Sequence, residues 1–172
     1  RMTGRTIRIE DQGGIRRIAI DRPEKANALS AVMMHALADA VRGGFRADII
    51  LLEGNCERGF SAGADIAEFL QGGEQLQRQE EGLKEIVSAF VDSRVPVVAA
   101  IHGRTLGAGV LVAGLSDLVI AADNLAFGLP EIRFNMYPVV VHAVLEEKIS
   151  PAQAFQLCAT GRLLSAVEAR AL

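Results

Sequence analysis

Residues 95–115, VPVVAAIHGRTLGAGVLVAGL, contain the strand, loop and helix on which the predicted fold depends. The continuous apolar run Val95–Ile101 is typical of a strand that is buried on both faces of a sheet. The glycine-rich segment Gly103–Gly109 follows this run, and Val110–Leu115 reads as a short apolar helix. Small residues between strand and helix let a ligand approach the backbone, and the first N–H groups of a helix point outward with a partial positive charge.

A second stretch of the same kind lies upstream, at Phe60–Ile66, FSAGADI. It follows an apolar run within Asp48–Glu53, which predicts another strand buried on both faces, and it precedes a predicted short helix at Ala64–Leu70. Each loop alone is compatible with an ordinary tight turn. If the two loops face each other, their backbone N–H groups form an oxyanion hole with two donors, suited to a developing enolate oxygen.

The rest of the chain adds elements that alternate between strand and helix. Thr6–Glu10 and Ile15–Asp21, separated by two glycines, predict a β-hairpin. Ser30 is a suitable N-cap for a helix at Ala31–Arg42. Apolar residues at helical spacing predict an amphipathic helix within Gln71–Arg94. This order of elements predicts an α/β fold in one domain.

The C-terminal third of the chain is predicted to carry one more strand and then mostly helices. Leu118–Ala122 predicts a third buried strand, and Pro130 is suited to the first position of a helix. Val139–Leu172 is predicted to be mostly helical. The helix predicted from Ser165 shows no stop signal before Leu172, so we expect the helical region to be incomplete at that point.

The composition argues against several classes of protein. The 172 residues include 18 basic and 21 acidic side chains without a block of like charge, which argues against nucleic acid as the main partner. No apolar run reaches the roughly 18 residues of a membrane span, and the first three residues show no signal-peptide pattern. Cys56, Cys158 and the three histidines form no ligand cluster, so we expect no metal and a reduced, cytoplasmic location.

Five short motifs, in order along the chain, resemble those of the crotonase (enoyl-CoA hydratase/isomerase) superfamily. The family patterns are N-R-P-x-x-x-N-A-L, A-G-A-D-I/L, A-A-I/V-x-G-x-x-x-G-G-G, C-D-I/L and F-G-x-P-E. The corresponding segments here are Asp21–Leu29, Ser61–Ile66, Ala99–Gly109, Ser116–Leu118 and Phe127–Glu131. The resemblance implies a crotonase-like spiral of ββα units over residues 1–137, with 138–172 as the start of the family's helical region. It also implies a homo-oligomer, a trimer or a dimer of trimers.

The resemblance further implies roles for single residues. The oxyanion donors would be the backbone N–H groups of Ala64 and Ala108, and Ala108 stands where the family usually has glycine. The residues at the nucleotide end of coenzyme A would be Lys25, Ala26, Ala62 and Ile66. No further cofactor is implied, because the substrate thioester itself carries the coenzyme A.

Glu131 would be the acid/base at the family's second glutamate position. Leu111 occupies the position of the first glutamate, and leucine cannot transfer a proton. One carboxylate is enough to move a proton between two carbons of a thioester, whereas hydration normally needs a second group that orients water. The sequence therefore favours an enoyl-CoA isomerase, with a hydratase or another crotonase reaction as the alternative. Asp65, Glu68 and His142 are possible substitutes for the missing glutamate.

Two other classes of protein share part of this pattern. The order of strand, Gly107–Ala113 and strand has the outline of a dinucleotide-binding unit, but its strand-to-helix connection is too long and its helix too short. A non-catalytic relative that binds acyl-CoA, RNA or a protein is compatible with Leu111. The apolar segment Asn135–Val141 replaces a glycine-rich stretch that many relatives have, and would line the acyl side of the site.

Overall fold

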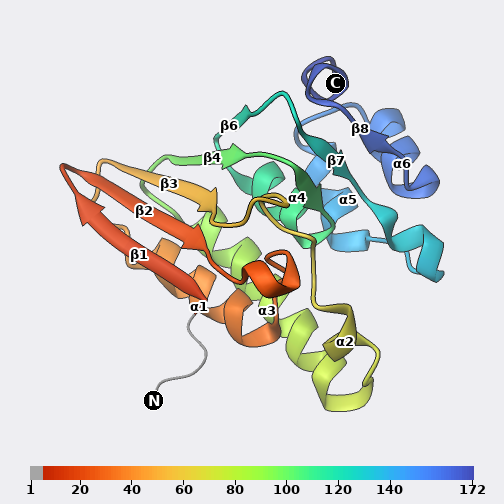
Figure 1. The fold of residues 1–172 in the computed structure, drawn as a ribbon, viewed down its shortest axis with the longest axis horizontal. Coiled ribbons are helices and arrows are strands. Elements are labelled where there is room, and N and C mark those ends of the chain that lie inside the picture. The colour runs from red at the N-terminus through yellow and green to blue at the C-terminus, as the bar shows by residue number, and fades with distance from the viewer. Residues whose placement is uncertain (1–5) are drawn as a thin grey trace.

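The computed structural model describes residues 6–172, and the fold is built on a five-stranded sheet (Figure 1). The strands lie in the order β1-β2-β3-β4-β6. Their bounds are Ile7–Gln12, Ile15–Ile20, Ile49–Gly54, Val97–Ile101 and Leu118–Ala121. β1 and β2 form the predicted antiparallel hairpin, and each of the other neighbouring pairs is parallel. The expectations for residues 1–5 lie outside the described residues.

A second, smaller sheet contains three short strands in the order β5-β7-β8, at Arg104–Leu106, Ala126–Gly128 and Leu163–Leu164. The chain passes from β4 to β5 and then into a helix, and from β6 to β7 and then into another helical segment. Each of these helical segments therefore follows one strand of each sheet. The segment after β3 repeats the pattern, because Ser61 forms a parallel bridge with Thr105 of β5. This repetition is the expected spiral of ββα units.

Two long helices cover one face of the larger sheet (Figure 1). α1, Ala31–Arg42, has the predicted bounds, and the Ser30 side chain accepts a hydrogen bond from the Met33 N–H at its start. α3, Gly73–Val91, packs along α1. Their buried residues join the inner face of the sheet in the main hydrophobic core, which includes Ile18, Leu37, Ile50, Ile86 and Ala99.

Shorter helices stand at the ends of the strands. These are η1 at Pro23–Lys25, α2 at Ile66–Phe69, α4 at Ala108–Leu115 and η2 at Pro130–Phe134. α2 begins two residues later than predicted because Asp65 is its N-cap and accepts a hydrogen bond from the Ala67 N–H. Pro130 starts η2 as predicted. The glycine-rich segment after β4 is not loop throughout, because residues 104–106 form β5.

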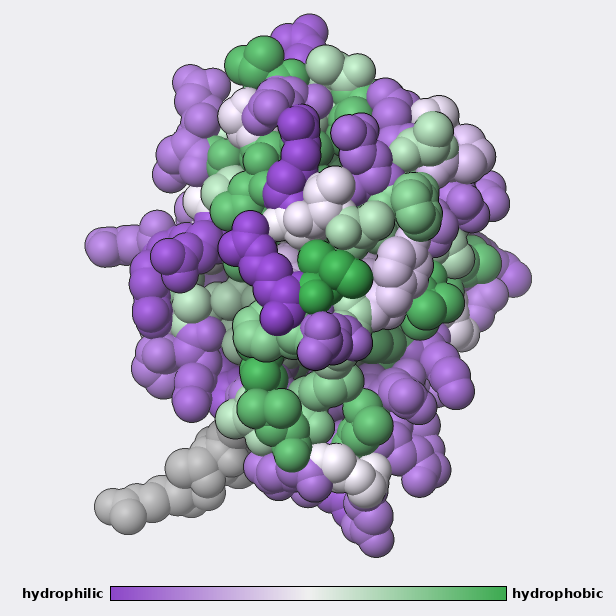
Figure 2. All heavy atoms as spheres, turned by 90° about the vertical axis from the view of Figure 1, so that its right-hand side faces the viewer, coloured by the Kyte–Doolittle hydropathy of each residue, from purple (hydrophilic) through white to green (hydrophobic). Residues whose placement is uncertain are grey.

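The C-terminal part contains α5 at Val139–Glu146, α6 at Pro151–Thr160 and α7 at Ala166–Arg170. A second cluster of buried apolar residues joins these helices to α4. The prediction that this region is mostly helical missed β8, which pairs with β7. Figure 2 shows the side of the molecule to which α6 and β8 belong, where groups of hydrophobic side chains lie among hydrophilic ones.

The prediction of a third buried strand is wrong for β6, although its position is right. Leu118 is 55% exposed and Ile120 is 57% exposed. β6 is the last strand of its sheet and pairs only with β4 among residues 6–172. A cavity of about 480 Å³ runs along it and is lined in part by Val119, Phe127 and Val167. β3 was also predicted to be buried on both faces. Its inner residues, Ile50 and Leu52, are buried, but the side chains on its other face are only half-buried.

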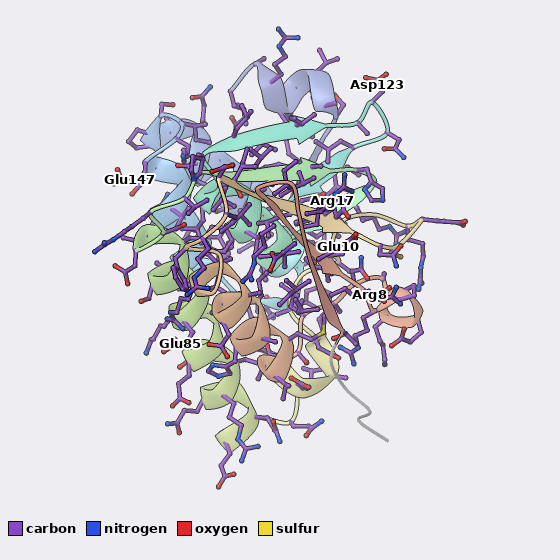
Figure 3. All side chains as sticks on the ribbon, turned by 90° about the vertical axis from the view of Figure 1, so that its left-hand side faces the viewer. Arg8, Glu10, Arg17, Glu85, Asp123 and Glu147 are labelled. Carbon is purple, nitrogen blue, oxygen red and sulfur yellow. The ribbon has the colours of Figure 1, made fainter. Side chains whose placement is uncertain are left out.

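Charged side chains of both signs occupy the strands of the hairpin. Glu10 and Arg17 are cross-strand partners, Arg17 pairs with Glu53 at 3.7 Å, and Arg8 forms an ion pair with Asp21. Figure 3 shows Arg8, Glu10 and Arg17 on these strands, with Glu85 on α3 at the other side of the view. In the part of the chain that the structure describes, no helix is long and apolar enough to cross a membrane.

Candidate active site

The two glycine-containing loops lie side by side. The Phe60 N–H donates to the His102 carbonyl at 2.9 Å, and the Ser61 N–H donates to the Arg104 carbonyl at 3.1 Å. In return, the Leu106 N–H donates to the Ser61 carbonyl at 2.9 Å. A Cβ placed on Gly63 would lie 3.0 Å from the Leu106 carbonyl oxygen. The backbones of the two loops are in direct contact at this point, and this close approach is possible because residue 63 is glycine.

Ala64 and Ala108 lie at the ends of these loops. Ala108 is the first residue of α4, so its N–H has no partner within the helix. Ala64 forms a bridge with Leu29, in which the Gly63 carbonyl and the Asp65 N–H make the hydrogen bonds. Within residues 6–172, neither the Ala64 N–H nor the Ala108 N–H donates to a protein acceptor. Both donors are therefore left unpaired by residues 6–172.

Glu131 lies against the second loop. Its carboxylate oxygen Oε1 is so close to Gly107 that a Cβ on that glycine would collide with it. The other oxygen, Oε2, is buried and has no hydrogen-bond partner among the described residues. Burial raises the pKa of Glu131 above its ordinary value. The chain thus places an uncompensated carboxyl group beside the start of α4, next to the residue that precedes Ala108.

The possible substitutes for the missing glutamate differ in what they contact. Leu111 is completely buried in the second apolar cluster. Asp65 caps α2 and forms a 2.8 Å ion pair with Arg22. Glu68 accepts hydrogen bonds from the Ala31 N–H at 3.0 Å and from Gln79 at 3.2 Å. Both carboxylates are therefore held in structural contacts, whereas His142 contacts a tyrosine hydroxyl.

The residues predicted to contact coenzyme A gather only in part. The Ala62 N–H donates to the Ala26 carbonyl at 3.0 Å, which joins the loop after η1 to the first glycine loop. Ala26 has a left-handed backbone with φ of 52°. Lys25 is the exposed last residue of η1, and Ile66 is the 42% exposed first residue of α2.

Asn27 belongs to the first of the five motifs, but the resemblance assigned it no role, and the structure shows it to be a positioning residue. It is completely buried, and its side-chain amide donates to the Phe60 carbonyl at 3.1 Å. Its side-chain oxygen accepts from the Arg22 N–H at 2.8 Å, and its own carbonyl accepts from the Ser61 hydroxyl at 2.8 Å. These bonds tie η1 to the first loop. The signal available in the sequence was the place of Asn27 in the N-A-L part of that motif.

Replacing Asp65 with alanine is expected to cost about 3 kcal/mol of unfolding free energy. The substitution removes the cap of α2 and the closest carboxylate of the Arg22 guanidinium, whose side chain is only 18% exposed. Chemical denaturation followed by circular dichroism would measure it. The matched control is Glu85→Ala, which breaks an exposed pair with Arg42 and should cost under about 1 kcal/mol. Equal costs would contradict the interpretation.

Comparison with known proteins defines the class. The sequence model described as enoyl-CoA hydratase/isomerase matches residues 10–172. A probable enoyl-CoA hydratase of Rhizobium meliloti is 36% identical over 98% of this chain and 66% of its own length. The human enoyl-CoA delta isomerase 2 is 32% identical over 95% of this chain and 43% of its own length. The chain thus spans less than two thirds of either relative.

Solved structures give the same result for the fold. The crystal structure of an enoyl-CoA hydratase from Thermoplasma volcanium matches 98% of this chain and 69% of its own with a TM-score of 0.90 and 28% identity. The fold is that of the crotonase superfamily. Within it, the chain belongs to the enoyl-CoA hydratase/isomerase family. The dinucleotide-binding alternative is wrong, because β5 lies between β4 and α4 in place of a tight turn.

Proposed function

We propose that the protein is an enoyl-CoA isomerase in which Glu131 moves a proton between two carbons of an acyl-CoA thioester. The observation that carries the proposal is the Glu131 carboxyl group, which lies against Gly107 with one buried oxygen unpartnered. A group in that position can abstract an α-proton and return it to another carbon. Leu111 supports the single-carboxylate mechanism, because it offers no second acid/base in α4.

The enolate formed by this abstraction needs a stabilising partner. We assign that role to the N–H groups of Ala64 and Ala108, which lie at the ends of the two adjoining loops. Loss of one such donor typically costs about 3–4 kcal/mol of transition-state stabilisation. Lys25, Ala26, Ala62 and Ile66 are assigned to the coenzyme A end, with the Lys25 ammonium near a phosphate. We further propose a cytoplasmic homo-oligomer as the working form.

The experiment is an assay of the full-length protein with a 3-enoyl-CoA and a 2-enoyl-CoA, each with wild type and Glu131→Gln. Migration of the double bond that the substitution abolishes is the expected result. Hydration that survives the substitution would mean that another residue is the acid/base. No turnover of either substrate, with coenzyme A still bound, would favour another reaction of the superfamily or a non-catalytic acyl-CoA-binding protein.

Hydratase activity is the second candidate. The Rhizobium meliloti relative that is described as a probable enoyl-CoA hydratase covers 98% of this chain, which supports it. Hydration requires a group that orients water, and Asp65 and Glu68 are already held in structural contacts. Hydratase activity therefore depends on a second residue that orients water and lies outside the positions of the two family glutamates.

The rate of isomerisation is expected to rise with pH through the pKa of Glu131. The abstracting group must be ionised, and burial raises its pKa above the ordinary 4.5. The midpoint of the acidic limb of kcat/KM should therefore lie above 4.5, and the rate should fall as pH drops through it. A pH series with a 3-enoyl-CoA substrate measures the midpoint. A midpoint at or below 4.5 would exclude the buried carboxyl as the base.

A further inference from the structure

α2 follows the first of the two glycine-containing loops and has little apolar packing. Ala64, whose N–H is assigned as an oxyanion donor, precedes Asp65, and Asp65 is the N-cap of α2. α2 contains four residues, none of which is buried. It lies at the edge of the molecule, next to the first turns of α3 (Figure 1). A segment with few buried apolar contacts opens easily, so the position of this one depends on its polar contacts.

Gln79 of α3 is a buried polar side chain that reaches this segment. It is only 2% exposed, although the residues on either side of it are exposed. Its side-chain Nε2 donates to the Asp65 carbonyl at 3.1 Å and to the Glu68 carboxylate oxygen Oε2 at 3.2 Å. The same Glu68 oxygen accepts from the Ala31 N–H at the start of α1, at 3.0 Å. Both hydrogens of the amide nitrogen are therefore used, which fixes the orientation of the Gln79 side chain.

The backbone on both sides of Ala64 is hydrogen-bonded to Leu29. The Leu29 N–H donates to the Gly63 carbonyl at 2.7 Å, and the Asp65 N–H donates to the Leu29 carbonyl at 2.8 Å. These two bonds hold the segment on one side, and the bond from Gln79 to the Asp65 carbonyl holds it from the opposite element, α3. The Ala64 N–H lies between these fixed points.

We propose that Gln79 is a positioning residue of the oxyanion hole, which holds the Ala64–Asp65 segment so that the Ala64 N–H faces the thioester oxygen of the substrate. The inference rests on the proposed function, since it needs the Ala64 N–H as an oxyanion donor. Gln79 acts through the Asp65 carbonyl and does not itself contact the substrate. A donor stabilises an oxyanion only when it is aimed at the place that the oxygen will occupy, so a small displacement of the segment weakens it.

The test is the polarisation of a bound thioester carbonyl in the full-length protein. A donor to the carbonyl oxygen lowers its stretching frequency, which infrared difference spectra measure for a saturated acyl-CoA that is isotope-labelled at the thioester carbon. Gln79→Met keeps the length of the side chain and removes both donors, so the frequency shift on binding is expected to be smaller than in wild type.

The same variant is expected to lose kcat more than substrate binding. With a 3-enoyl-CoA, kcat for isomerisation should fall about 10-fold and KM should change less than about twofold. The loss is smaller than the about 100-fold that a displacement of about 1 Å typically costs, because the two bonds to Leu29 remain. Gln79→Glu is the second variant, since its ionised carboxylate keeps the shape of the amide and cannot donate. It should give the same reduced shift, and it keeps the inference testable if Gln79→Met fails to fold.

The matched control is Gln77→Met, because Gln77 is exposed on the same helix and donates to Glu81 at 2.9 Å. It should leave the frequency shift and kcat unchanged. Thermal unfolding of each variant sets a temperature at which all of them are folded. Gln79 variants that melt earlier but keep the wild-type shift and kcat would overturn the inference and leave the proposed function intact. A wild type that binds the acyl-CoA without any frequency shift would instead overturn the oxyanion donors of the proposed function, and the inference with them.

Discussion

Glu131→Gln is expected to lower the isomerisation rate by about 100-fold to 10,000-fold, the usual contribution of a positioned acid/base. The amide has nearly the shape of the carboxyl group and fits the same space beside Gly107, so the loss should appear in kcat with little change in binding. The amide cannot accept the α-proton. Steady-state kinetics with a 3-enoyl-CoA and titration of coenzyme A binding measure the two effects separately.

The control for this substitution is Glu147→Gln. Glu147 is exposed at the end of α5, and Figure 3 shows it at the edge of the molecule. Its neutralisation changes the net charge by the same amount and should leave the rate within about twofold of wild type. If the two variants lose activity equally, or if Glu131→Gln keeps the wild-type rate, then the carboxyl beside Gly107 does not transfer the proton.

Gly107→Ala is expected to lower activity by about 100-fold. Gly107 has a φ of 51°, and a Cβ at this position would collide with Glu131 Oε1. The carboxyl group must then move, and a displacement of about 1 Å at a reacting group typically costs about this factor. The new methyl group also lies next to the Ala108 N–H. Kinetics with the 3-enoyl-CoA measures the loss, and a melting curve measures the backbone strain.

Gly13→Ala is the control that measures the effect of backbone strain without a collision between the new methyl group and another side chain. Gly13 lies in the β1–β2 turn with a φ of 57°, and a Cβ there would meet no atom within 4 Å. Both substitutions should reduce stability by about 1 kcal/mol or more, because each forces alanine to a positive φ, and the cost should be larger at Gly107, where the Cβ also collides with Glu131. Only Gly107→Ala should reduce activity. An active Gly107→Ala variant would show that Glu131 can work from another position.

Much of the fold followed from local patterns in the sequence. The bounds of α1 were predictable because Ser30 supplies a cap and the apolar residues keep a helical spacing. The hairpin and the positions of β3, β4 and β6 followed from short apolar runs between turn residues. β5 and β8 were missed because strands of two or three residues carry too little pattern to differ from loop.

The burial of β6 was mispredicted for a different reason. An apolar run indicates that side chains avoid water, but it does not indicate what covers them. In the site, the two loops followed from the strand–loop–helix pattern and Glu131 from the resemblance, and neither could show that Oε2 lacks a partner among residues 6–172. The contact of Tyr137 with His142 depends on how the chain enters α5, which residue types alone do not determine. The roles of the coenzyme A residues stay predictions.

The side of β6 that has no partner strand among residues 6–172 has a consequence for work with the chain in solution. An edge strand whose side chains are apolar on both faces is a template on which another molecule can add a strand. Edges of natural sheets usually carry lysine, proline or a bulge that prevents such addition, and Leu118–Ala121 has none of these residues. Aggregation of these 172 residues should therefore begin at β6 and be governed by protein concentration, independently of the chemistry at Glu131.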